Sequence, residues 1–225
     1  MEQSFLIYKS ELSRLDFCCQ EFIVVIAMKI PEKRGRGRPR AFDRDSALNR
    51  AMRLFWNRGY DGTSLADLTE AMDLSPSSLY ATFGDKEALY KAAVDHYLSG
   101  PGSYMGRALA RPGPARAVFA QMLAEAAREL SEPTQPAGCM VALGATHCSP
   151  QSSAVQDFLR EKRAESLRLL AARVAPAELP AGVTPEQMAS FMMAVLQGMS
   201  VQARDGASEA ELLALGRLAL RSWPE

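Results

Sequence analysis

The sequence predicts an all-α protein of about nine helices, and three observations support this fold class. Apolar residues recur at helical spacing through most of the chain, few segments alternate as strands do, and proline and glycine separate the helical segments. The 225 residues are 48% apolar and 23% charged, a composition typical of a globular protein. That length suits one large or two small domains.

Composition excludes several classes of protein. The longest apolar run, FIVVIAM at residues 22–28, is far shorter than the ~18–20 residues of a membrane span, and the acidic residues before it argue against a signal peptide. The four cysteines, Cys18, Cys19, Cys139 and Cys148, form no CxxC pair, which favours a reduced, cytoplasmic setting. We therefore predict a cytoplasmic protein that has no contact with a membrane.

Residues 1–28 differ from the rest of the chain, because they contain no proline or glycine and no clear helix cap. We predict that this stretch is a non-native or disordered extension, in which residues 1–27 precede the natural start at Met28. The alternative is an added amphipathic helix that packs on the protein.

The first predicted helix spans 43–58. Asp43 is a suitable N-cap and Gly59 a suitable C-terminal stop. One apolar stripe follows the spacing i, i+3, i+4, i+7, formed by Leu48, Ala51, Met52 and Phe55.

Two short helices follow. Ser64 and Asp67 fit a capping box, and Leu65, Leu68 and Met72 form the buried face of the helix that they begin. After a break at Asp73–Leu74, Ser75 is a natural N-cap with Pro76 at the first helical position. The inward residues of this third helix are Leu79 and Phe83, four apart.

A fourth helix begins near Asp85 and ends at Gly100–Pro101, and a linker rich in helix breakers follows it. Beyond the linker the pattern predicts five more helices, at 114–130, 138–148, 152–174, 184–204 and 208–223.

The second and third predicted helices have the form of a helix-turn-helix. In such a unit the later helix, here the third, enters the DNA major groove. Leu65, Leu68, Leu74, Leu79 and Phe83 can pack the two helices against each other and against the first helix. The outward residues of the third helix are small or hydroxylated, and such side chains can approach base edges closely: Ser77, Ser78, Ala81 and Thr82, with Tyr80 to one side. The alternative is an ordinary helical hairpin in a core.

A basic arm precedes this unit and favours the DNA-binding alternative. Residues 29–40 carry six basic side chains and one acidic one, although the whole chain has 26 of each. Glycine and proline separate the four arginines Arg34, Arg36, Arg38 and Arg40. A mobile cationic arm can follow the minor groove and neutralise phosphates, whereas the alternative is a solvated tail.

The stretches FWNRGYDGTSLADLTEAMDLS and SLYATFGDKEALY resemble the DNA-binding domain of TetR/AcrR-type (tetracycline-repressor-like) transcriptional regulators, and the resemblance covers residues 36–97. It implies phosphate contacts at Thr63, Ser64, Tyr80 and Lys86. It also implies that Ser75, Ser77 and Ser78 lie at the groove end of the recognition helix. The family often has lysine at the position of Pro76 and an aromatic residue at that of Thr82, so we expect DNA shape and the arm to contribute more than base-by-base readout.

The resemblance further implies a C-terminal bundle that binds a small effector and dimerises through its last two helices. Apolar stripes in 184–204 and 208–222 allow such a four-helix interface; the alternative is that both belong to the core of one protomer. Methionines adapt to varied ligands, so we predict that Met122, Met140 and Met192 line the effector pocket.

We therefore predict an arm at 29–40, a helix-turn-helix domain at 41–100 and an effector-binding, dimerising domain at 101–225. The predicted function is a homodimeric repressor, released from a palindromic double-stranded DNA operator when an effector moves the fourth helix. The alternatives are a metal- or thiol-responsive regulator using Cys139, His147 and Cys148, or a helical enzyme. The sequence has none of the hydrolase, zinc-protease or P-loop motifs, and we predict no catalysis, no cofactor and no bound metal.

Overall fold

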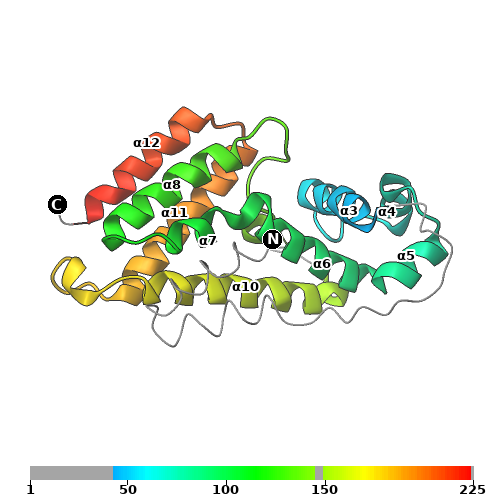
Figure 1. The fold of residues 1–225 in the computed structure, drawn as a ribbon, viewed down its shortest axis with the longest axis horizontal. Coiled ribbons are helices and arrows are strands. Elements are labelled where there is room, and N and C mark those ends of the chain that lie inside the picture. Colours follow the sequence, from blue (N-terminus) through cyan, green and yellow to red (C-terminus); the bar gives the residue numbers. More distant parts are fainter. Residues whose placement is uncertain (1–42, 145–148, 224–225) are drawn as a thin grey trace, which may run out of the picture. The chain divides into compact units, whose positions relative to one another are not determined.

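The computed structural model describes residues 43–144 and 149–223, and they form helices joined by turns and loops, with no strand among them (Figure 1). These residues contain ten α-helices: α3 (Arg44–Arg58), α4 (Leu65–Met72), α5 (Pro76–Phe83), α6 (Lys86–Ser99), α7 (Tyr104–Leu109), α8 (Ala115–Leu130), α9 (Met140–Leu143), α10 (Ser153–Ala172), α11 (Pro185–Arg204) and α12 (Glu209–Ala219). The all-α fold class is therefore confirmed. The arm and the extension at 1–28 lie outside the described residues.

The N-terminal helices begin where their caps predict. Asp43 accepts a hydrogen bond from the Asp45 amide at 3.1 Å. Ser64 and Asp67 form the reciprocal capping box of α4, and Ser75 caps α5 with Pro76 as its first residue. These signals are local, because each depends on residues within one helical turn.

Two elements differ from the prediction. α7 was not predicted, and it brings the described α-helices to ten where about nine were expected. It forms inside the breaker-rich linker because Tyr104 and Ala108 are buried against α8. α9 is much shorter than the helix predicted at 138–148, since it ends at Gly144. A Cβ at Gly144 would collide with the Met140 carbonyl oxygen and would lie 2.9 Å from Leu159 Cδ1, so glycine is the residue that fits at the end of α9.

The first hydrophobic cluster joins α3, α4, α5 and α6 and also takes in residues from α9 and α10. Aromatic rings meet edge to face at its centre: Phe55 and Tyr90 lie 4.9 Å apart between ring centroids, and Trp56 and Tyr97 lie 4.8 Å apart. Such pairs stabilise a core beyond the area that they bury. The predicted boundary at residue 100 thus does not separate this cluster from the rest of the chain.

Leu65 corrects one prediction of the core. Its side chain is 37% exposed, whereas Leu68, Leu79 and Phe83 are buried. Leu65 is the first residue of α4, so it lies at the end of the apolar stripe. Leu74 is partly buried and packs against the cluster.

The second cluster is built around α8, which packs against α7, α11 and α12 (Figure 1). Glu125 of α8 is buried and is surrounded by donors: Gln121 at 2.9 Å, Arg111 at 2.9 Å and Arg107 at 3.3 Å. Burial alone would raise the pKa of Glu125, but these hydrogen bonds and charges outweigh it, and the pKa lies below its usual value. The two arginines therefore hold α7 and the segment after it against α8.

Candidate nucleic-acid interface

The turn between α4 and α5 has the geometry of a helix-turn-helix. Asp73 adopts the left-handed conformation, with φ 55° and ψ 49°, and ends α4. Its amide donates to the Glu70 carbonyl and the Leu74 amide to the Thr69 carbonyl, so the chain reverses within three residues before α5 begins at Pro76. Aspartate tolerates this conformation better than most residues.

The first turn of α5 presents a cluster of hydroxyl groups. Ser75 Oγ lies 3.0 Å from Ser77 Oγ and 2.9 Å from Ser78 Oγ, and it accepts from the Ser78 amide at 3.2 Å. Ser75 and Ser77 are exposed and Ser78 is half-buried. The Ser77 and Ser78 hydroxyls each pair with the Ser75 hydroxyl, so they can exchange that partner for a base edge or a phosphate with little net loss of hydrogen bonds.

Two further residues singled out on α5 remain accessible to solvent. Tyr80 is 46% exposed, and Thr82 is half-buried. The inward residues Leu79 and Phe83 are buried in the first cluster, so α5 keeps its opposite face free.

Thr63 has a different role from the predicted one. Its side chain is fully buried, and its hydroxyl donates to the Gly59 carbonyl at 2.7 Å. A buried hydroxyl with a partner inside the protein cannot reach a phosphate in this conformation. Thr63 instead holds the turn between α3 and α4.

Ser64 is exposed, but its donors are already in use. Its amide and its hydroxyl both donate to Asp67 Oδ2, at 2.8 Å and 2.5 Å, while Asp67 Oδ1 accepts from Arg58 at 2.9 Å. The hydrogen bonds from Ser64, and then Arg58, lower the pKa of Asp67. A phosphate at Ser64 must therefore displace a carboxylate.

Lys86, the first residue of α6, is half-buried and lies over the Tyr60 ring at 4.2 Å from the ring centroid. Burial lowers the pKa of Lys86, and the nearby Asp61 carboxylate opposes this effect. The ammonium is thus held in one place by a cation–π contact, at the start of a helix whose free amides attract anions.

Sequence reasoning missed Arg44. This exposed residue begins α3, and its guanidinium lies 5.0 Å from the centroid of the Phe83 ring at the end of α5. The contact places a fixed positive charge beside α5. Its position directly after the basic arm was the signal in the sequence. Arg34, Arg36, Arg38 and Arg40 lie outside the described residues.

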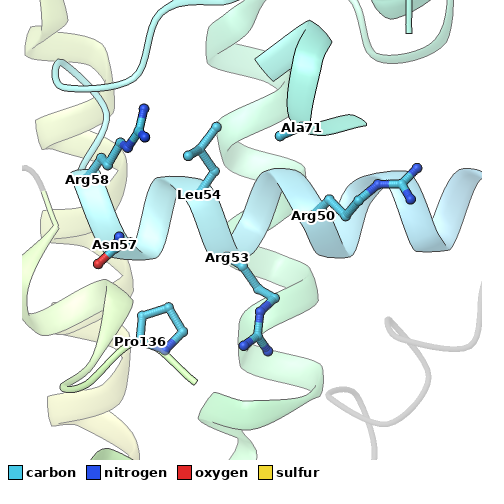
Figure 2. A pocket seen from close by; sticks show the side chains of 7 residues that line it. All are labelled: Arg50, Arg53, Leu54, Asn57, Arg58, Ala71 and Pro136. Carbon is cyan, nitrogen blue, oxygen red and sulfur yellow. The ribbon is translucent and has the colours of Figure 1, made fainter. Parts of the chain in front are cut away.

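A surface groove of about 400 Å³ lies along α3. It is lined by Arg50, Arg53, Leu54, Asn57, Arg58, Ala71 and Pro136. Figure 2 shows that its three arginine side chains point away from one another. Arg50 donates to the Met72 carbonyl, Arg53 to the Thr134 carbonyl and Arg58 to Asp67. The guanidinium groups are therefore used in packing α3 against its neighbours and do not converge on one ligand.

The three methionines of the predicted effector pocket are all buried. Met122 and Met192 belong to the second cluster and Met140 to the first. An effector pocket lined by Met122, Met140 and Met192 stays a prediction.

Among the described residues, no three histidine, cysteine or acidic side chains are grouped so that they could hold a metal ion. Two residues of the alternative metal site, His147 and Cys148, lie outside the described residues. Cys139 is half-buried between the two clusters, beside the hydroxyls of Tyr97 and Tyr104. Its sulfur accepts from the Ala142 amide at 3.5 Å and caps α9.

None of the described helices combines the length and the apolar composition that crossing a bilayer requires.

Comparison with known proteins agrees with this geometry. The sequence profile of the bacterial regulatory proteins of the tetR family matches residues 47–93. The chain is 36% identical over 198 residues to the HTH-type transcriptional repressor ComR of Escherichia coli K12, a match that covers 86% of this chain and 94% of that protein. It is 30% identical over 188 residues to the repressor BdcR of the same organism, covering 84% of this chain and 92% of that protein.

Solved structures give the same result. A cysteine mutant of the TetR family regulator CifR, in complex with 26-bp double-strand operator DNA, has a TM-score of 0.78 and 46% sequence identity, over 83% of this chain and all of that one. The chain belongs to the tetR family of bacterial regulatory proteins, and it is a DNA-binding regulator of transcription.

Proposed function

We propose that the chain is a homodimeric repressor that binds a palindromic operator and leaves it when a small molecule binds the C-terminal bundle. One observation carries the proposal: α5 presents the exposed Ser77 and the half-buried Ser78 hydroxyls on a helix whose inner face is anchored by Leu79 and Phe83. The repressor names of ComR and BdcR and the operator complex of CifR support it. Such a protein acts by binding and not by catalysis, in the cytoplasm where the DNA is.

In this proposal, the first turn of α5 enters the major groove. Ser77 and Ser78 are the residues that contact base edges, and Tyr80 reaches a phosphate. Hydroxyls can both donate and accept, so each tolerates more than one base. Specificity then depends in part on the shape of the DNA.

The contacts to the DNA backbone come from around α5. Lys86 is held at the start of α6 and Arg44 at the start of α3, so each brings a positive charge toward a phosphate at low entropic cost. Ser64 contacts a phosphate when that phosphate replaces the Asp67 carboxylate as the acceptor of its hydrogen bonds. The arm at 29–40 adds cations that follow the minor groove.

The proposed dimer forms through α11 and α12. Three large apolar side chains on these helices remain exposed in the single chain: Phe191 is 43% exposed, Val201 47% and Leu218 59%. Meanwhile Met188, Met192 and Leu212 are buried in the second cluster. The two helices thus have one face in the core and a second apolar face that a partner copy would cover.

The test is DNase footprinting with the purified protein on the region upstream of its own gene and of neighbouring genes. We expect one protected palindrome whose half-sites are about 34–36 Å apart, one turn of DNA. The double variant Ser77→Ala, Ser78→Ala removes two base contacts from each protomer, or four from the dimer. At about 1 kcal/mol for each contact, operator affinity should fall by roughly 1,000-fold. Ser153→Ala, which removes an exposed hydroxyl from α10, is the matched control and should bind as the parent does.

Protection of no palindrome by the parent protein would contradict the proposal. Equal affinity of the double variant and the control would contradict the role of α5.

A further inference from the structure

The C-terminal end of α3 is capped by an arginine from a distant helix. Arg204 of α11 donates to the Trp56 carbonyl at 2.9 Å and to the Asn57 carbonyl at 3.3 Å. The last carbonyls of a helix have no partner within the helix, and the negative end of its dipole favours a cation. One guanidinium therefore satisfies two carbonyls and fixes where α3 ends relative to α11.

A second connection runs from the same end of α3 to the same helix. Trp56 Nε1 donates to the Gly138 carbonyl at 2.9 Å in a buried hydrogen bond. The next residue, Cys139, donates through its amide to Ser200 Oγ at 2.7 Å. Gly138 has φ 79°, and a Cβ there would lie 2.7 Å from the Ser200 carbonyl oxygen, so only glycine lets the loop approach α11 so closely.

Both connections end on one turn of α11, at Ser200 and Arg204. The same helix carries Phe191 and Val201, which belong to the proposed dimer face. An α-helix is stiff over a few turns. The groups that hold α3 and the groups that would meet the partner copy therefore move together.

Hydrogen bonds fix the angle between two helices more sharply than apolar contacts do, because they are directional. Burial of apolar surface is non-directional, so the first cluster fixes the tilt of α3 less sharply than directional hydrogen bonds do. A two-pronged guanidinium contact has a preferred geometry. Arg204 is thus placed to decide the orientation of α3 and, through the shared core, of α5.

We infer that Arg204 is a positioning residue: by capping α3 from the proposed dimer helix, it fixes the distance and rotation between the two recognition helices and so sets the half-site spacing that the protein accepts. The inference rests on the proposed dimeric binding of a palindrome. The sequence predicts that an effector acts on the recognition helices by moving α6. The Arg204 contact from α11 is a second connection between the C-terminal helices and the recognition helix.

The experiment compares spacing profiles. The operator found by footprinting is made with one or two base pairs inserted or removed at its centre. Each base pair changes the separation by about 3.4 Å and the rotation by about 35°, since one turn contains about 10–10.5 base pairs. Affinities of the full-length protein are measured for all five operators.

We expect the parent to lose about 100-fold in affinity for a two-base-pair change, a penalty of the size that two mismatched base pairs impose. Arg204→Ala should bind the best operator more weakly and lose less than about tenfold over the same change, because a loosened recognition helix can follow a displaced half-site. Arg204→Lys keeps the charge and one donor group, and should give an intermediate profile. Arg116→Ala removes an exposed arginine of α8 and should keep the parent profile.

A purely structural role for Arg204 would weaken binding to all five operators by the same factor, and that result would overturn the inference. If the alanine variant does not fold, judged by its helical circular dichroism, Arg204→Lys provides the same comparison with a smaller change of the same sign. A parent protein that protects no palindrome overturns the proposed function and the inference with it. A parent that binds, together with unchanged profiles for the variants, overturns the inference alone.

Discussion

Asp61 lies in the turn between α3 and α4 and binds residues far away in the sequence. Its carboxylate accepts hydrogen bonds from the Ser149 amide at 2.8 Å and from the Ser152 hydroxyl at 2.5 Å. These residues precede α10, so Asp61 acts as a cap supplied from another part of the chain. The two hydrogen bonds, the Ser149 amide first, lower the pKa of Asp61.

The lowered pKa predicts how stability depends on pH. A carboxyl whose folded pKa is below its unfolded value, about 3.9, contributes stability that is complete above that value and is lost as pH falls through the folded pKa. Asp61→Asn should therefore be less stable than the parent in urea denaturation near neutral pH, and the difference should shrink under acid conditions. A difference that does not change with pH would show that the charge has no role.

Thr63 allows a direct test of its corrected role. Thr63→Val keeps the shape of the side chain but removes the hydrogen bond to Gly59, so we expect the free energy of unfolding to fall by about 1 kcal/mol. Urea denaturation without DNA measures this change. The matched control is Thr134→Val, because the Thr134 hydroxyl bonds to Glu132 in an exposed loop, and its effect should be smaller. Equal stability of Thr63→Val and the parent would contradict the structural role.

At the scale of elements, the helices with local signals were predicted and the others were not. α3 to α6 follow from caps, apolar spacing and glycine or proline stops, all within a few residues. α7 has weak local signals and exists because α8 buries Tyr104 and Ala108. α9 has a helical pattern but stops at Gly144, where a Cβ would collide with the Met140 carbonyl oxygen and with Leu159.

The effect of the arm at 29–40 on operator binding is predicted from its charge alone. Removing residues 29–40 takes away six cations and one anion. We expect weaker operator binding and a flatter dependence on salt, because each phosphate that is no longer neutralised reduces the slope of log K against log salt by about 0.9. Affinities measured at several salt concentrations check this, with removal of residues 1–28 alone as the control. An unchanged slope would show that the arm does not touch the DNA.

At the scale of the whole molecule, the proposed dimer can be separated from folding. Leu218 is 59% exposed in the single chain, so Leu218→Glu should leave each protomer folded while placing a charge in the proposed interface. We expect a shift from dimer to monomer in analytical ultracentrifugation and a large loss of operator affinity. Leu169→Glu, at a leucine of α10 that is 40% exposed, is the matched control and should remain dimeric. If both variants remain dimers, the interface lies elsewhere.

The sequence by itself determined the fold class, the caps of α3 to α6 and the helix-turn-helix, because caps and helical spacing act within short stretches of chain. Only the tertiary structure decided that Leu65 is exposed, that Thr63 is buried and that Met140 belongs to a different cluster from Met122 and Met192.

The tertiary structure also decided that Arg204 caps α3 and that Asp61 caps the start of the segment leading into α10. These contacts join residues about 90 to 150 positions apart. A local pattern holds no information on which distant group will satisfy a buried carbonyl or a turn carboxylate, so these two caps could be found only in the folded chain.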